Sequence, residues 1–295
     1  MKKILQIYTL TFFLAAIFIS CEKELMINKE LKPDITLNCL FSEDSTISAF
    51  LSYTKSPYLS SNFKYIDNAI IVVKNREKAI SFTHQNDGFY LSDVKPQIFG
   101  VYNIEVDIPG VEKLEAESSI PNNIEIDTLT TEVSFIDEGN KILKIDLKIK
   151  ISQQPAFLIF RHIVEKKILS SQNDTLMFQD TSWLSANDGK SLKLPENLNK
   201  IAFYYLKENA NYNLEINSFD GFKKNSNLLE GISKFEVIDC SKDYFEYMIS
   251  NLLYNSSTKE SQTTIINPVD YYSNIKNGIG IFAGYRILRI NKMFH

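Results

Sequence analysis

The sequence has little of what most enzyme active sites need. It contains three histidines and three cysteines in 295 residues, and His84, His162 and His295 are too scattered to match the ligand spacing of a metal site. It carries no G-x-S-x-G elbow, no Walker loop and no H-E-x-x-H helix. His162 and Glu165 lie three residues apart on an expected strand, so their side chains point to opposite faces. We therefore expect no catalytic residue, no metal site, no cofactor and no enzyme activity.

A basic excess is also missing. The formal net charge is −4, with 32 basic and 36 acidic residues. Removal of residues 1–20 takes away two lysines and no acid, which changes the net charge to −6. A mildly acidic chain without a basic stripe lacks the electrostatic footprint of a nucleic-acid-binding protein, so we expect no nucleic-acid partner.

The long apolar run of this chain is confined to its N-terminus. Lys2 and Lys3 precede a run over residues 4–19 that is interrupted by one glutamine and a few hydroxyl groups. A basic start followed by a short apolar segment is typical of a secretory signal peptide, and the run is too short for a comfortable transmembrane helix of about 20 residues. We predict that residues 1–20 are a signal peptide and not part of the fold.

The cysteine that follows the run predicts a lipid anchor. Phe18-Ile19-Ser20-Cys21 resembles a bacterial lipobox, although Phe18 stands where leucine is commonest. An ordinary secretory signal with a chance cysteine is the alternative. The resemblance implies that Cys21 is the lipidation site, carrying palmitate or similar acyl chains, and several chains hold a protein to a bilayer better than one. Residues 21–33 are then a lipidated tether.

The charged residues that follow the cysteine indicate where in the cell the protein is located. Glu22-Lys23-Glu24 resembles the export signal that sends lipoproteins of the Bacteroidota to the outer face of the outer membrane. A solvated tether, which is charged in any case, is the alternative explanation. We expect a protein that is lipid-anchored in the outer membrane and exposed at the cell surface.

Two cysteines remain once Cys21 is set aside. Cys39 and Cys240 lie far apart in the chain. An oxidising envelope permits a disulfide between them. Lone cysteines at such a distance are more typical of small buried hydrophobic residues, so the sequence leaves both alternatives open.

Glycine is scarce, with 10 residues, whereas tyrosine (15) and phenylalanine (20) are abundant, which favours β-structure. Residues 34–121 contain seven short apolar or alternating segments separated by turn signals such as Asn86-Asp87-Gly88 and Pro109-Gly110. This spacing predicts an N-terminal Ig-like or transthyretin-like β-sandwich. The order of its Ala-led strand, D-G-x-Y hairpin and G-x-Y strand resembles the carboxypeptidase-regulatory and transthyretin-like group.

Residues 122–295 are predicted to form a second β-rich domain with one short helix. Residues 141–151 show the clearest alternation in the chain, with lysines and an aspartate on one face and branched aliphatic residues on the other. Residues 241–254 are the expected helix: Ser241 is a candidate N-cap, and an apolar stripe recurs at a spacing of three to four. We expect Ala283-Gly284 to form a turn and residues 285–290 to form the final strand.

Two further stretches resemble a known family. They are Ser241-Lys242-Asp243-Tyr244-Phe245-Glu246-Tyr247 and the glycine-rich segment from Tyr272 to Tyr285, of which the pattern S-N-I-x-N-G-x-G-x-F-x-G is the specific part. Together with the lipobox and first sandwich, they resemble the Bacteroidota lipoprotein family called domain of unknown function 4249. Ala283 stands where glycine is commoner. The resemblance implies an outer-membrane lipoprotein that is often encoded beside a TonB-dependent transporter, and it implies no chemistry.

The functional expectation follows from the anchor and the resemblance. We expect a surface-exposed outer-membrane lipoprotein that acts as a non-catalytic binding or accessory subunit of a TonB-dependent transport system. Its expected partners are the outer membrane, through the lipid anchor, and a TonB-dependent β-barrel transporter. The alternative is a structural or adhesion component of the cell envelope.

Overall fold

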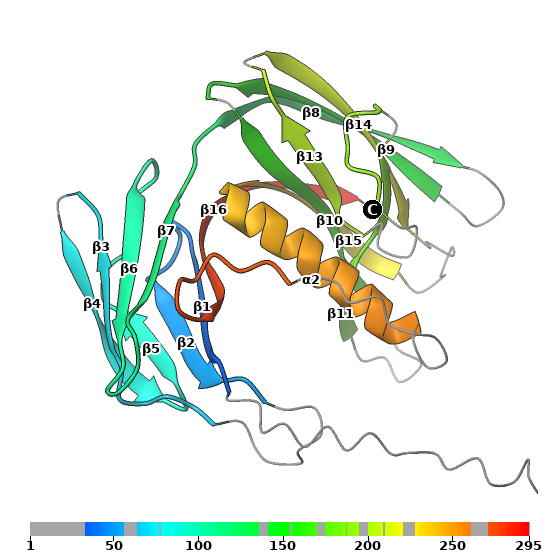
Figure 1. Ribbon diagram of the computed structural model, residues 1–295. Helices are drawn as coiled ribbons and strands as arrows, with labels where there is room; N and C mark the ends of the chain where they lie inside the picture. Colours follow the sequence, from blue (N-terminus) through cyan, green and yellow to red (C-terminus); the bar gives the residue numbers. More distant parts are fainter. Residues whose placement is uncertain are drawn as a thin grey trace, which may run out of the picture. The chain divides into compact units, whose positions relative to one another are not determined.

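The protein is mostly β, with one helix among the described residues, which confirms the predicted fold class (Figure 1). The predicted signal peptide, Cys21 and most of the predicted tether lie outside the described residues. Pro33–His295 form one compact unit, and the domain boundary at residue 121 stays a prediction. The computed structural model describes residues 33–55, 64–76, 78–135, 141–153, 155–169, 175–186, 188–194, 200–208, 210–220, 228–260 and 271–294.

All seven predicted N-terminal strands are present and form what we call the first sandwich. Strand β4 joins its two layers, because its first half pairs with β3 and its second half with β5. Asp87 and Gly88 make the β4–β5 turn with positive φ angles of 46° and 72°. The strands are β1 (Ile35–Phe41), β2 (Ser48–Tyr53), β3 (Ile70–Lys74), β4 (Ala79–Asn86), β5 (Phe89–Ser92), β6 (Val101–Asp107) and β7 (Leu114–Ser119).

Alternating residues of these strands point inward and form the first core. The rings of Phe41 and Tyr102 meet edge to face at 5.4 Å between centroids. The buried Tyr90 hydroxyl donates to the carbonyl of Ile66 and accepts from the amide of Ala69, so its polar end is satisfied by backbone. Layers of alternating strands closed over such residues are the expected solution for an antiparallel sandwich.

Strand β16 (Ile279–Phe294), the last strand of the chain, lies beside β1, the first (Figure 1). Residues 279–284 pair in parallel with β1, and residues 285–294 pair antiparallel with β15 (Leu228–Cys240). The last strand therefore completes the first sandwich as well as the sheet that follows it.

The predicted turn at Ala283-Gly284 is wrong, and so is the start of the final strand at residue 285. Both residues lie within β16, and Ala283 is fully buried. Gly284 has another purpose: a Cβ atom there would lie 2.4 Å from the carbonyl oxygen of Ser119. The glycine lets β16 pass close to the end of β7 rather than reverse direction.

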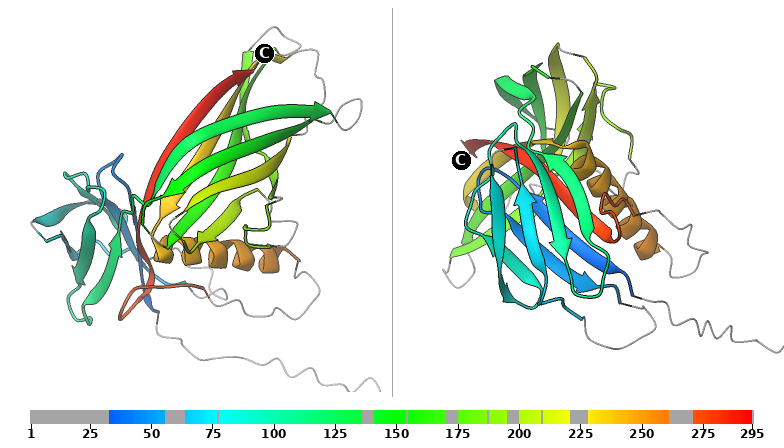
Figure 2. Two further views of the ribbon diagram at one scale, coloured as in Figure 1. Left: turned by 90° about the horizontal axis from the view of Figure 1, so that it is seen from above. Right: turned by 60° about the vertical axis from the view of Figure 1, so that its left-hand side comes forward.

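The rest of the chain forms what we call the second sandwich (Figure 2). One layer has the order β12-β14-β9-β8, and the other contains β11, β10, β15 and the second half of β16, with β13 paired to β10. The added strands are β8 (Ile124–Phe135), β9 (Lys141–Ile151), β10 (Ala156–Leu169), β11 (Thr175–Thr181), β12 (Trp183–Ala186), β13 (Ala202–Leu206) and β14 (Asn211–Asp220).

The predicted two-faced strand at residues 141–151 is confirmed as β9. Ile145, Leu147 and Ile149 are buried in the second core, between the two layers, whereas the intervening residues face outward. Strand β8, its neighbour, was not predicted. The pairing of β8 with β9 shifts between Ile126 and Thr128, so a bulge breaks the alternation that would have revealed the strand.

Helix α2 (Lys242–Glu260) confirms the predicted helix and extends six residues beyond it. The Ser241 hydroxyl accepts the amide of Tyr244 at 3.3 Å, which is the predicted N-cap. Tyr244 and Phe245 pack on the outer face of β10, β15 and β16 in a third core. That sheet is therefore covered on both faces, as the apolar stripe of the helix predicts.

Cys39 and Cys240 are free thiols, each buried in a different core. The structure thus answers the open question in favour of small buried hydrophobic residues. In the described part of the chain, no helix is both long and apolar enough to cross a bilayer.

Candidate functional site

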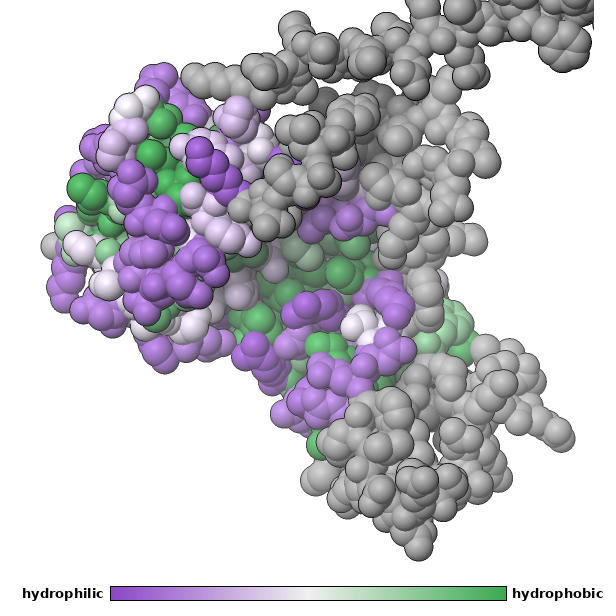
Figure 3. Space-filling model, turned by 90° about the horizontal axis from the view of Figure 1, so that it is seen from below, coloured by the Kyte–Doolittle hydropathy of each residue, from purple (hydrophilic) through white to green (hydrophobic). Residues whose placement is uncertain are grey.

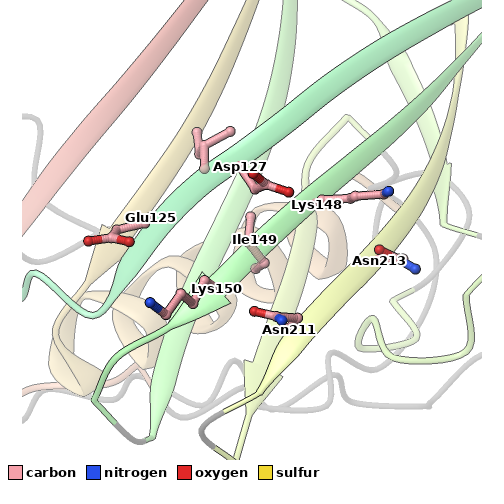
Figure 4. Close-up of a pocket in the computed structure, with 8 residues that line it drawn as sticks. Glu125, Asp127, Lys148, Ile149, Lys150, Asn211 and Asn213 are labelled. Atoms are coloured by element: carbon pink, nitrogen blue, oxygen red, sulfur yellow. The ribbon is translucent and has the colours of Figure 1, made fainter.

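A pocket of about 660 Å³ opens on the outer face of the layer that contains β8, β9 and β14 (Figure 4). We call it the polar hollow. Ile126 and Ile149 also border it, although their side chains pack in the second core on the other face of the layer. Its polar side chains are Glu125, Asp127, Lys148, Lys150, Asn211 and Asn213.

Strand register arranges these side chains in two rows. Glu125 lies opposite Lys150, which lies opposite Asn211. In the next row Lys148 lies between Asn213 and the β8 bulge, where Asp127 is the extra residue. A bulge re-aims a side chain, and here it adds a second carboxylate to the hollow. Figure 4 shows the rows projecting from three neighbouring strands.

The buried face of the same layer fixes this arrangement. Ile145, Leu147 and Ile149 alternate with the lysines along β9 and are at most 1% exposed. A one-residue slip would expose all three, so the register that places the hollow is well determined. The polar side chains of the hollow are therefore carried on paired strands rather than on a loop.

The charges of the hollow balance but do not pair. Two carboxylates face two ammonium groups, yet no hydrogen bond or ion pair joins the six polar side chains to each other or to other side chains in the described ranges. On the same strand face just outside the hollow, Lys144 does pair with Asp146, at 3.6 Å. The hollow thus presents to solvent donors and acceptors that pair with no other described side chain.

A second recess, of about 450 Å³, lies where β6 and β7 meet the start of α2. Its walls include Phe99, Val101, Pro121 and Phe157. Phe99 has a φ of 63° and is 54% exposed, and its amide donates to the carbonyl of Ile120. Polar side chains, among them Glu117, Lys242 and Asp243, also line it, so the recess is mixed in character. Apolar side chains also gather in a recess beside the first sandwich (Figure 3).

The buried titratable side chains of the second sandwich include a histidine and an aspartate. The His162 ring lies between the hydroxyls of Ser218 and Ser233, at 2.7 and 3.0 Å. Burial lowers its pKa to about 4. Burial also raises the pKa of Asp239 to about 6, although its carboxylate accepts the amide of Asn123 at 2.7 Å.

These two groups do not approach a reactive site. His162 stacks on Phe235 at 4.6 Å between ring centroids, and its partners are serines that point inward. Glu165, which sequence places near it, instead pairs with Lys234. Their different partners agree with the expected opposite orientation. Among the described residues, no three histidine, cysteine, aspartate or glutamate side chains converge as a metal site would require.

The one site residue predicted from sequence, Cys21, lies outside the described residues. The polar hollow was not predicted. The alternating lysines of β9 were recognised as a solvent-facing row, but Asn211 and Asn213 come from a strand 60 residues later, and Asp127 reaches the hollow through a bulge. A single sequence contains no signal for the register in which β8, β9 and β14 pair.

A family model matches residues 22–290. The chain belongs to the family Domain of unknown function (DUF4249). This confirms the predicted family membership. No curated protein matches the chain.

Chains of solved structures also match this DUF4249 protein. One comes from the structure titled "Chaperone-tip adhesin complex is vital for synergistic activation of CFA/I fimbriae biogenesis". It is 10% identical, and the match covers 69% of this chain and 82% of that chain, with a TM-score of 0.19. At that TM-score, no property is carried across.

The stretch that carries the family resemblance is structural in this DUF4249 protein. The side-chain amide of Asn274 accepts the N–H of Phe282 and donates to its carbonyl, at 2.9 and 2.8 Å. The Ser273 hydroxyl accepts the amide of Gly280. Lys276 exchanges two backbone hydrogen bonds with Glu115 on β7. These contacts satisfy the strand edges where β16 enters the first sandwich.

Proposed function

We propose that this protein is a surface-exposed outer-membrane lipoprotein that acts as a non-catalytic binding or accessory subunit of a TonB-dependent transport system. The polar hollow is the observation that carries the binding role. It gathers, on three neighbouring strands of one layer, six polar side chains that pair with no other side chain among the described residues, which suits the recognition of a ligand. The lipobox at Cys21 and the charged tether support the location.

The chemistry of the hollow favours binding over catalysis. Its lining contains carboxylates, ammonium groups and carboxamides, and it contains no histidine, cysteine, serine or threonine. Glu125, Asp127, Lys148 and Lys150 are all exposed. Catalytic acids and bases are usually set apart from water by burial or by a close charged partner. Exposed side chains on three adjacent strands instead offer hydrogen bonds to a docked molecule.

The length of the tether limits the distance between the folded part of the protein and its lipid anchor. Thirteen residues, 21–33, separate the lipidated cysteine from the first strand. Fully extended, they span at most roughly 45 Å. A subunit with this reach can contact the extracellular face of a neighbouring barrel while its lipid stays in the membrane.

Lipidation is tested by labelling cells with a palmitate analogue. The wild-type protein should carry the label and fractionate with the outer membrane, and Cys21→Ala should do neither, because it lacks the acylated thiol. Cys39→Ala is the matched control, since this thiol is buried. Labelling that survives in Cys21→Ala would refute the anchor.

The transport role is tested by affinity purification of the tagged lipoprotein from detergent-solubilised native outer membranes, followed by mass spectrometry. We expect stoichiometric recovery of one TonB-dependent barrel. Recovery of no barrel would overturn the accessory role. A deletion strain with altered envelope integrity and normal uptake would support the structural or adhesion alternative.

A further inference from the structure

We propose that the polar hollow binds a neutral, polyhydroxylated ligand, a saccharide of one or two rings. This inference rests on the proposed binding function and names the class of its ligand. It uses the two rows of side chains across β8, β9 and β14. The argument depends on the size of the hollow, the kinds of groups that line it, and the balance of its charges.

The size of the hollow fits such a ligand. Adjacent strands lie about 4.8 Å apart, so the three strands span about 10 Å, and alternate residues along a strand are separated by about 7 Å. The six polar groups thus cover a footprint of one or two sugar rings. A volume of about 660 Å³ lies within the ordinary range of small-molecule sites.

The lining groups match the hydrogen bonding of hydroxyls. A hydroxyl both donates and accepts, a carboxylate only accepts, an ammonium group only donates, and a carboxamide does both. Glu125 and Lys150 stand directly opposite each other, so neighbouring hydroxyls of one ligand can donate to the first and accept from the second. Asn211 continues the row with both functions. Bonds to the charged groups are the stronger ones.

The charge balance selects a neutral ligand. Two carboxylates and two ammonium groups line the hollow. An anion would be attracted by the lysines but repelled by Glu125 and Asp127. A cation would be attracted by the carboxylates but repelled by the lysines. A zwitterionic dipeptide is the competing class, but the carboxylates lie only one strand away from the lysines. Its two ends would engage one carboxylate and one ammonium group and would leave the other two charged groups without a partner.

An ordinary solvated strand face differs from this hollow in one respect. Lys144 and Asp146, on the same face of β9, neutralise each other at 3.6 Å. Lys148 and Lys150 do not pair in this way, although carboxylates lie on the neighbouring strand. The lining carries no aromatic ring. We therefore expect weak binding, with a Kd on the order of 0.1–1 mM.

The test is titration calorimetry and saturation-transfer NMR with the full lipidated protein in detergent micelles. The probes are neutral mono- and disaccharides, with glycyl-glycine as the zwitterion and a sulfated disaccharide as the anion. At least one neutral saccharide should bind in the stated range. We expect the double variant Lys148→Ala/Lys150→Ala to weaken that binding at least tenfold, because it removes both central donors.

Lys144→Ala is the matched control, since it removes a lysine from the same face of β9 outside the hollow. It should leave saccharide binding unchanged. The inference is overturned if no neutral saccharide binds, if only the dipeptide or the anion binds, or if the double variant binds as the wild type does. Recovery of a barrel partner together with any of these results would refute the ligand class and leave the accessory role standing.

Discussion

The two sandwiches solve the problem of buried polar groups differently. In the described part of the first sandwich, the buried polar side chains other than tyrosines are serines. In the second sandwich they include His162, Glu236 and Asp239. Glu236 is held between Arg161 and Arg289, whereas Asp239 leaves one carboxylate oxygen without a hydrogen-bond partner among the described residues.

This difference separates two sources of stability. The first sandwich depends on backbone shape, because β16 must enter it beside β1 at very close range. The second depends on polar groups that stay satisfied only in one protonation state. The first should therefore be sensitive to added side-chain volume where β16 meets β1, and the second should depend on the protonation states of its buried histidine and aspartate.

The largest expected loss of stability comes from a substitution in the first sandwich. Gly280 has a φ of 119°, and a Cβ atom there would lie 2.1 Å from the carbonyl oxygen of Leu37 on β1. Gly280→Ala should cost more than about 3 kcal/mol of unfolding free energy, because β16 must move away from β1. Urea denaturation followed by circular dichroism measures the loss.

Gly110→Ala is its control. Gly110 also has a positive φ, of 79°, but a Cβ atom there would meet nothing within 4 Å. Only the backbone preference is lost, so the expected cost is about 1 kcal/mol. Equal losses at the two positions would show that the close approach of β16 and β1 contributes little.

The next effect concerns pH and the second sandwich. Burial holds the pKa of His162 at about 4 in the folded protein, against about 6.5 when unfolded. Both states are neutral above pH 6.5, and below it the unfolded state binds the proton first. The His162 contribution to stability should therefore fall by up to about 3 kcal/mol between pH 6.5 and 4. The difference in unfolding free energy between the wild type and His162→Gln, followed across this range, measures this contribution, since the variant lacks the imidazole.

The titration of Asp239 should change stability in the opposite direction over much of the same pH range. Its pKa is raised to about 6 by burial, despite the nearby Arg286, whereas an unfolded aspartate titrates near 3.9. The folded protein binds the proton first, so stability should rise by up to about 3 kcal/mol as pH falls from 6 to 4. In the wild type the two effects nearly cancel, and Asp239→Asn should reveal the loss due to His162. An unchanged pH profile in Asp239→Asn would contradict this account.

The sequence predicts local patterns of this fold better than its long-range pairings. The alternation of β9, the turn at Asp87-Gly88 and the N-cap at Ser241 are short-range features, and all three are confirmed. Strand β8 was missed because one bulged residue shifts its phase. The pairing of β1 with β16 joins residues more than 240 positions apart, and no periodicity reports it. The polar hollow depends on three strands in register, so it was missed for the same reason.

The smallest expected change in stability concerns the N-cap of α2, which lies outside the cores of the two sandwiches. Ser241→Ala removes the hydroxyl that accepts the amide of Tyr244, which should cost about 1 kcal/mol. Lys242→Ala, one residue further along α2 and exposed, should change stability by less than about 0.5 kcal/mol. Thermal denaturation of both variants measures the difference. If the two variants lose equally little, the start of α2 is fixed by the packing of Tyr244 and Phe245 on the sheet rather than by its cap, because that contact would hold the first turn without the hydroxyl.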